Sequence, residues 1–202
     1  PNDVLLDFGC GTGIFSIRAA RTVGQVIGLD ISEKMLDWSR RLAGEDSSIN
    51  WLLGNGESIA LDDDTVDWVI ARESLCYVQT EKLPAMIAEI HRVLRPGGHF
   101  LWLEQTSDDP SFQRHPQAPL LEKRPVQELI RIARIAGFTL QSAHCVRTPR
   151  FPWIFPVWFG LVPKQWISTL ARAEVKWQRR FGKLQGRRWR DVLLILRKSE
   201  GP

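Results

Sequence analysis

The chain of 202 residues has only three cysteines, Cys10, Cys76 and Cys145, which are far apart and odd in number. This set excludes a disulfide framework and a zinc knuckle, and it is typical of a reducing compartment. No segment reaches the roughly 20 consecutive apolar residues that a membrane-spanning helix needs. No signal peptide is visible after Pro1. We therefore expect a cytoplasmic protein, and we predict no metal site.

Internal repeats and low-complexity tracts are also absent. Hydrophobic residues make up 44% of the chain and charged residues 25%, which is ordinary for a globular protein and excludes collagen-like and disordered chains. The simplest interpretation is one domain over residues 1–202.

The basic charge is confined to one segment. The net charge is +4, yet residues 1–163 carry 16 Lys and Arg against 20 Asp and Glu. Residues 164–190 carry nine basic residues against the single acid Glu174. The chain is thus an acidic domain with a strongly basic segment near its C-terminus.

Short apolar runs alternate with helical patterns over most of the chain. We predict strands at 4–8, 25–30, 50–53, 66–71, 99–104, 139–146 and 191–197. We predict helices at 14–23, 33–41, 83–94 and 125–136. Such alternation is typical of a doubly wound, mostly parallel sheet with helices on both faces.

The strongest functional signal is a glycine loop between the first strand and helix. Gly9, Gly11 and Gly13 let the backbone turn sharply and approach a ligand closely. Asp30 ends the next strand, where an acid can accept both ribose hydroxyls of a nucleoside. Ile14 stands where a dinucleotide fingerprint needs glycine or alanine, and no Gly-Lys-Ser/Thr of a P-loop follows. Asp7 before the loop suits a cationic or zwitterionic ligand better than a pyrophosphate.

Five motifs in order resemble the class I S-adenosylmethionine-dependent methyltransferases, particularly the small-molecule branch. They are LDFGCGTG, VIGLDIS, LLGNGESIAL, VDWVIARESLCYV and EIHRVLRPGGHFLWLE. The resemblance covers about residues 3–145. It implies a Rossmann-like, seven-stranded sheet with an antiparallel last strand, a role that DVLLILR at 191–197 fits.

The resemblance also implies which residues hold the methionine part of S-adenosylmethionine. Asp7, Gly9 and Gly11 would face it from the glycine loop. Ala71 and Arg72, at the end of the fourth strand, would flank its amino group.

Four further residues would hold the nucleoside, by the same resemblance. Asp30 would bind the ribose and Ile31 would pack on the adenine. Asn55, where the family often has Asp, would accept from the adenine amino group through its side-chain carbonyl. Gly56 would offer a backbone N–H.

Methyl transfer from a sulfonium needs alignment above all, and a general base only for a hydroxyl or a protonated amine. Candidates lie after the fourth and fifth strands, where open α/β sheets bind ligands. They are Glu73, Tyr77, Glu104 and, in the expected loop 105–120, His115. Each has a structural alternative: Glu73 caps a helix, Tyr77 packs on the cofactor, Glu104 holds a loop N–H, and His115 is solvated.

Residues 149–190 form an aromatic and basic insertion between the last two strands. Prolines interrupt the apolar run 151–163, and an apolar stripe at helical spacing follows it. The stripe consists of Trp166, Leu170, Ala173, Trp177, Phe181 and Leu184. The insertion fits a roof over the acceptor pocket or a homo-oligomer face. It also fits a peripheral membrane contact through 151–190. Nucleic acid is a third alternative, which the acidic remainder of the chain disfavours.

From these features we predict an S-adenosylmethionine-dependent methyltransferase. Its acceptor would be a small or lipid-linked molecule, such as a lipid-linked glycan, methylated at oxygen. The alternatives are a non-catalytic cofactor-binding or interaction module of a larger protein, and a nucleic-acid methyltransferase.

Overall fold

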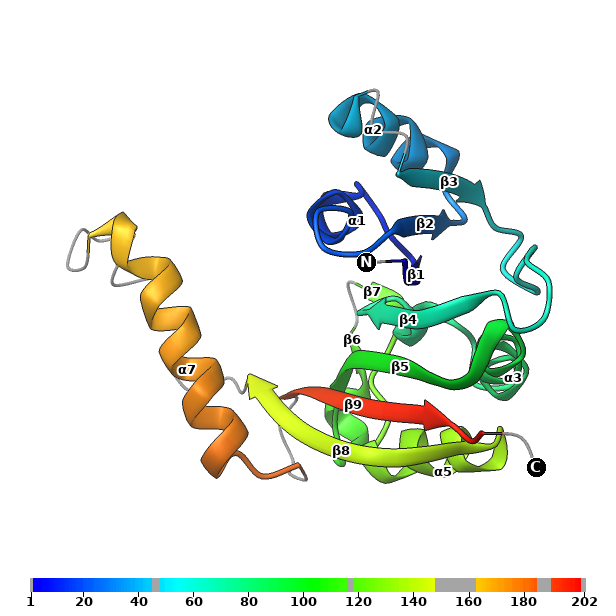
Figure 1. Cartoon of the computed structure of the whole chain (residues 1–202). Helices are drawn as coiled ribbons and strands as arrows, with labels where there is room; N and C mark the ends of the chain where they lie inside the picture. The colour runs from blue at the N-terminus through cyan, green and yellow to red at the C-terminus, as the bar shows by residue number, and fades with distance from the viewer. Residues whose placement is uncertain (1, 45–47, 116–117, 148–162, 185–189, 201–202) are drawn as a thin grey trace.

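The computed structural model describes residues 2–44, 48–115, 118–147, 163–184 and 190–200. Within these ranges the chain builds one seven-stranded sheet in the order β3-β2-β1-β4-β5-β9-β8 (Figure 1). Its strands are β1 (Val4–Phe8), β2 (Gln25–Asp30), β3 (Ile49–Leu53), β4 (Val66–Arg72), β5 (Leu94–Thr106), β8 (Phe138–Arg147) and β9 (Arg190–Lys198).

The last strand runs against its neighbours. β1 to β5 pair in parallel, whereas β9 is antiparallel to both β5 and β8. The predicted Rossmann-like fold is therefore confirmed, including the antiparallel strand. The carboxyl ends of β1, β2 and β4 meet at one edge of the sheet, which is where such folds bind ligands.

Helices cover both faces of the sheet. α1 (Ile14–Ala19) and α2 (Glu33–Ala43) pack on one face, over a small apolar cluster around Leu5 and Val26. α3 (Leu83–Val93) and α5 (Val126–Ile135) cover the other face over the larger core, which includes Phe100 and Trp102. Because each face of the sheet is covered, its inner strands are apolar almost throughout.

Several boundaries differ from the prediction. α1 ends at Ala19 rather than at residue 23, because the amides of Thr22 and Val23 close turns on the carbonyl of Ala19. The segment 105–120, expected as a loop, continues β5 to Thr106 and then carries three short elements. They are α4 (Pro110–Gln113), β6 (Arg114–His115) and the start of β7 (Ala118–Glu122), the last two pairing in a two-stranded ribbon.

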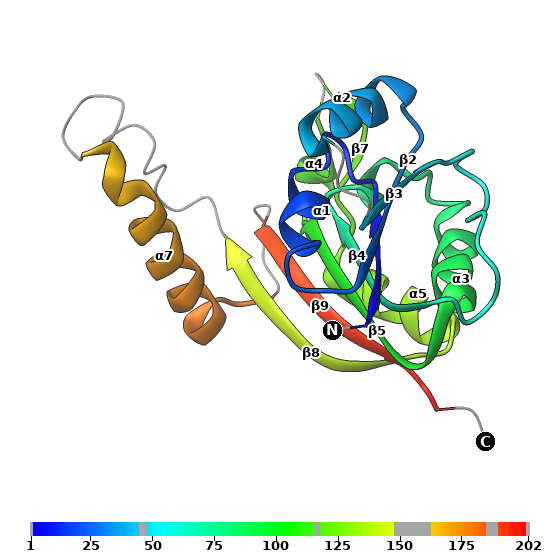
Figure 2. The same ribbon diagram turned by 45° about the horizontal axis from the view of Figure 1, so that its top comes forward.

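The basic segment forms a helix that projects from the domain. η2 (Lys164–Trp166) leads into α7 (Ile167–Phe181), which leaves the β8 edge of the sheet in both views (Figures 1 and 2). Its 15 residues make a helix of about 22 Å, shorter than the stripe 166–184 predicts. The proline-interrupted run lies almost wholly outside the described residues. Among those described, no helix is long and apolar enough to cross a bilayer.

Candidate functional site

The glycine loop packs against the segment that follows β4. Gly9 has φ +72°, and a Cβ built on it would lie 2.4 Å from Cβ of Ser74. The Ser74 hydroxyl donates to the carbonyl of Phe8 at 2.9 Å and ties the two segments together. Only glycine fits this position, because both the left-handed backbone and the close approach exclude a side chain.

Replacing Gly9 tests this contact. Gly9→Ala should lower the free energy of unfolding by about 2–5 kcal/mol, from left-handed strain plus overpacking against Ser74. Gly11→Ala is the matched control, since Gly11 has φ +56° with nothing within 4 Å of its Cβ position. It should cost about 1 kcal/mol. Urea unfolding measures both, and equal losses would refute the close approach.

Asp30 is held by two backbone amides at the end of β2. Gly11 N–H donates to its Oδ2 at 2.8 Å, and Ser32 N–H donates to its Oδ1 at 2.9 Å. Each oxygen therefore has one protein partner. A carboxylate has about four acceptor positions in total, so capacity remains for two further donors.

Asp30 lines a cavity of about 440 Å³ at the carboxyl edge of the sheet. Residues from β1, β2, the β4–α3 segment and α3 surround it. They are Phe8, Gly9, Leu29, Asp30, Ile31, Gly56, Glu73, Ser74, Tyr77, Val78, Gln79, Lys82 and Met86. The cavity thus brings together six of the residues predicted from the sequence: Gly9, Asp30, Ile31, Gly56, Glu73 and Tyr77.

Four predicted cofactor residues of β1, the glycine loop and β4 do not line this cavity. Asp7 is fully buried and accepts from the Ser16 hydroxyl at 2.6 Å, and burial raises its pKa. Its Oδ1 has no hydrogen-bond partner among the described residues. Ala71 is fully buried, and the Arg72 guanidinium lies 4.5 Å from the centre of the Phe15 ring. Gly11 reaches the cavity indirectly, through its bond to Asp30.

Asn55 uses its side chain within its own loop. Its Oδ1 accepts from the backbone amides of Glu57 and Ser58 at 2.8 and 2.9 Å. Both lone pairs of that oxygen are therefore engaged, and the neighbouring Gly56 takes φ +75°. Contact between Asn55 and adenine stays a prediction.

Glu73 has a strained backbone at the mouth of the cavity. It has φ +52°, which is uncommon for a residue with a side chain, and its amide donates to the Leu103 carbonyl at 2.8 Å. The Arg147 guanidinium lies 3.9 Å from Glu73 Oε1 and 2.6 Å from Asp191 Oδ2. Strain of this kind persists at sites that use it, which favours a functional role for Glu73.

A second acid, Glu104, lies in the protein interior near Glu73. Glu104 is 2% exposed, and its Oε2 accepts from Trp102 Nε1 at 3.1 Å. Burial raises the pKa of Glu104 to about 7 and that of the Tyr77 phenol above its usual value. Burial, followed by the charge of Glu104, raises the pKa of the Cys76 thiol. Glu104 therefore carries a proton below about pH 7.

This proton makes stability depend on pH. The folded-state pKa of about 7 lies above the ordinary value of 4.5, so the folded state binds the proton more tightly than the unfolded state. The contribution of Glu104 is present below about pH 4.5 and is lost as the pH rises through 7. The free energy of unfolding of Glu104→Gln, measured relative to that of the wild type, should rise by about 3 kcal/mol from pH 4.5 to pH 8. Urea unfolding across this range measures the gain, and a pH-independent difference would contradict it.

The remaining catalytic candidate, His115, lies on the β6–β7 ribbon. Its backbone pairs with Ala118, and its side chain lies outside the part of the chain that the structure describes. The ribbon reaches the cavity region because β7 lies against η1 (Leu75–Tyr77).

Arg124 is a structural residue that sequence reasoning missed. This side chain is only 4% exposed and donates to the carbonyl of Val78 at 2.6 Å and to Glu122 at 2.9 Å. It fixes the segment that carries Tyr77 to the end of β7. No motif marks such a residue, because its partners are backbone carbonyls distant in sequence.

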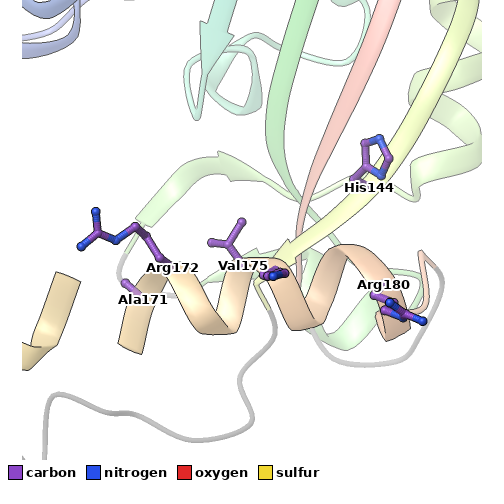
Figure 3. Close-up of a pocket in the computed structure, with 6 residues that line it drawn as sticks. His144, Ala171, Arg172, Val175 and Arg180 are labelled. Atoms are coloured by element: carbon purple, nitrogen blue, oxygen red, sulfur yellow. The ribbon is translucent and has the colours of Figure 1, made fainter. Parts of the chain in front are cut away.

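A second cavity, of about 630 Å³, lies between α7 and β8. Its lining residues are His144, Ala171, Arg172, Val175, Lys176 and Arg180 (Figure 3). None of the residues predicted to bind the cofactor or to act in catalysis belongs to this set.

The fold and the glycine-lined cavity agree with a comparison by sequence family. Residues 6–102 match the family described as a methyltransferase domain. Over this stretch the chain resembles the class I S-adenosylmethionine-dependent methyltransferases. The family's cofactor is S-adenosylmethionine.

Two curated relatives of the chain illustrate the range of the family. A demethylmenaquinone methyltransferase of Symbiobacterium thermophilum is 38% identical over 56% of the chain and 47% of the relative. A malonyl-[acyl-carrier protein] O-methyltransferase of Yersinia pestis is 35% identical over 74% of the chain and 55% of the relative. The chain thus spans about half the length of these relatives.

Solved structures show the same fold. The crystal structure of an S-adenosylmethionine-dependent methyltransferase from Mesorhizobium loti superposes with a TM-score of 0.69 at 20% identity. The match covers 98% of this chain and 91% of that one.

Proposed function

We propose that this chain binds S-adenosylmethionine in the 440 Å³ cavity and transfers its methyl group to a small or lipid-linked acceptor, at oxygen. The observation that carries the proposal is Asp30, fixed by the amides of Gly11 and Ser32 at the cavity wall. An ionised carboxylate in this position can accept both hydroxyls of a ribose, through charge-assisted hydrogen bonds.

The rest of the cavity fits the same cofactor. Ile31 follows Asp30 directly and is 71% exposed, which leaves an apolar surface for a flat base. Gly9 and Gly56 admit close backbone approach because they lack side chains. Behind the loop, Asp7 supplies a buried carboxylate oxygen with no partner among the described residues, on the side proposed for the methionine ammonium.

When bound, S-adenosylmethionine supplies a methyl group already activated by its sulfonium. The protein must then align the acceptor and remove its proton. We assign the removal of this proton to the carboxylate of Glu73. Glu73 lines the cavity, and its strained backbone and the Arg147 guanidinium orient it. Tyr77 would pack against the bound molecule from the same segment. His115 would approach from the ribbon that adjoins it.

The acceptor class rests on the relatives. One relative is named for a quinone precursor, and the other is named as an O-methyltransferase of a carrier-bound acyl group. Both names fit a small or tethered acceptor, and the second supports oxygen as the methylated atom. A lipid-linked glycan belongs to the same class. We keep one domain over residues 1–202, with 149–190 as its insertion, as part of the proposal.

A screen of acceptors with methyl-labelled cofactor tests this function. We predict label transfer to a hydroxyl of a lipid-linked or other small acceptor. Cofactor binding without transfer to any acceptor would favour the non-catalytic module. Transfer to nucleic acid alone would favour a nucleic-acid methyltransferase. Gel filtration of the same sample measures whether the chain forms a homo-oligomer.

A further inference from the structure

α7 and the residue before it carry large apolar side chains that the described part of the domain leaves exposed. Trp166, Ile167, Trp177 and Phe181 are 47–56% exposed, and we call these four residues the exposed patch. At 100° per residue, they fall within about 100° of one another on the helix. The rings of Trp177 and Phe181 lie 4.5 Å apart and form one aromatic surface.

The packing of α7 turns this patch away from the domain. Gln178 is buried, at 3% exposed, and its Oε1 lies 3.8 Å from Sγ of Cys145 on β8. On the helix, Gln178 lies about 100° from Trp177 and about 60° from Phe181. Val175, which lines the cavity between α7 and β8, lies about 160° and about 120° from these two rings. The helix therefore touches the sheet edge with one side and leaves the patch on another, as its projecting position indicates (Figures 1 and 2).

Cations accompany the patch. Arg172, Lys176 and Arg180 recur every fourth residue along α7, where they line the open cavity toward β8 and remain exposed to solvent; Figure 3 shows Arg172 and Arg180 on this helix. None of the three has an ion-pair partner among the described residues. The Arg180 guanidinium lies 5.5 Å from the centre of the Phe181 ring, so positive charge borders the aromatic surface.

We propose that α7 is an in-plane membrane-binding helix, whose occupant is a bilayer containing anionic phospholipid. The exposed patch would enter the boundary between headgroups and acyl chains, where tryptophan is favoured. Lys176 and Arg180, with Arg172 behind them, would attract the anionic headgroups. This surface does not depend on methyl transfer, because neither the patch nor the cations line the cofactor cavity.

Charge favours a bilayer over a second copy of the chain. A symmetric dimer through α7 would place two sets of unpaired cations at one interface, and like charges there disfavour association. Nucleic acid fits less well, because residues 1–163 carry four more acids than bases and would be repelled by phosphates. Anionic lipid matches both the cations and the apolar patch.

Vesicle flotation of the full chain tests this proposal. We expect binding to vesicles of 70% phosphatidylcholine and 30% phosphatidylglycerol at low salt, at least tenfold weaker binding at 0.5 M salt, and none to pure phosphatidylcholine. Trp177→Ala with Phe181→Ala should weaken binding at least tenfold. The matched control is Trp38→Ala, because Trp38 is 62% exposed on α2 and should not contribute.

A charge-matched pair of variants completes the test. Arg172→Gln, Lys176→Gln and Arg180→Gln together should reduce binding at least tenfold. Arg21→Gln, Lys34→Gln and Arg41→Gln remove the same charge from exposed positions elsewhere and should retain it. Equal loss in both sets, equal binding to neutral vesicles, or no binding at low salt would overturn the proposal. So would a dimer that the patch variant dissociates without any vesicle binding. Calorimetry of S-adenosylmethionine binding should be unchanged in the α7 variants, which separates failure here from failure of the proposed function.

Discussion

Asp30→Ala is expected to weaken S-adenosylmethionine binding about a hundredfold, as measured by isothermal calorimetry. The substitution removes two charge-assisted hydrogen bonds to the ribose, each worth about 1.5–3 kcal/mol. It also releases Gly11 and Ser32, whose amides donate to this carboxylate. The loop then loses the bonds that hold it against the cavity.

Two companion variants make this result specific. Asp30→Asn keeps the size of the side chain and one carbonyl acceptor but loses the charge. Its affinity for the cofactor should therefore lie between those of Asp30→Ala and the wild type. Asp37→Ala removes a carboxylate that is 52% exposed on α2 and pairs with Arg40, and it should bind like the wild type. An Asp30→Ala protein that stays folded and keeps wild-type affinity would remove the ribose assignment.

Glu73→Gln should lower kcat for an oxygen acceptor about a hundredfold while leaving cofactor affinity within a factor of two. A positioned general base contributes at least this much to a proton-removing reaction. Glutamine keeps the shape of the side chain but cannot accept a proton. Steady-state kinetics with the acceptor from the screen gives kcat, and calorimetry gives the affinity.

The control is Glu81→Gln, an exposed acid a few residues further along that does not line the cavity. It should leave kcat unchanged. If Glu73→Gln also leaves kcat unchanged, Glu73 is not the base. An acceptor that has no proton to lose, such as a thioether or a neutral tertiary amine, would then account for the result.

Much of the fold and part of the site could be predicted from the sequence because they depend on local pattern. Each strand is a run of consecutive apolar residues, and the glycine loop and Asp30 follow two successive strands. Backbone sterics restrict how such segments can connect. Gly9 illustrates this, since the turn between the first strand and helix needs a left-handed residue there. Asp30 then meets the loop because parallel strands bring their carboxyl ends to one edge.

The features that could not be predicted depend on contacts that no residue type specifies. The side-chain oxygen of Asn55 accepts from two amides of its own segment, a pairing that the residue type does not specify. No motif reveals Arg124, because it donates to main-chain carbonyls of residues 46 and 49 positions away. The position of α7 could not be predicted either, because an apolar stripe predicts a buried face but does not show which surface covers it.

The central claim is that the cavity beside Asp30 is a nucleoside-cofactor site. Isothermal calorimetry of the wild-type chain with S-adenosylmethionine tests it most directly. We predict saturable binding of one molecule per chain, lost to a large degree in Asp30→Ala and retained in Asp37→Ala. Absence of binding by the folded chain, or equal affinity in both variants, would contradict it.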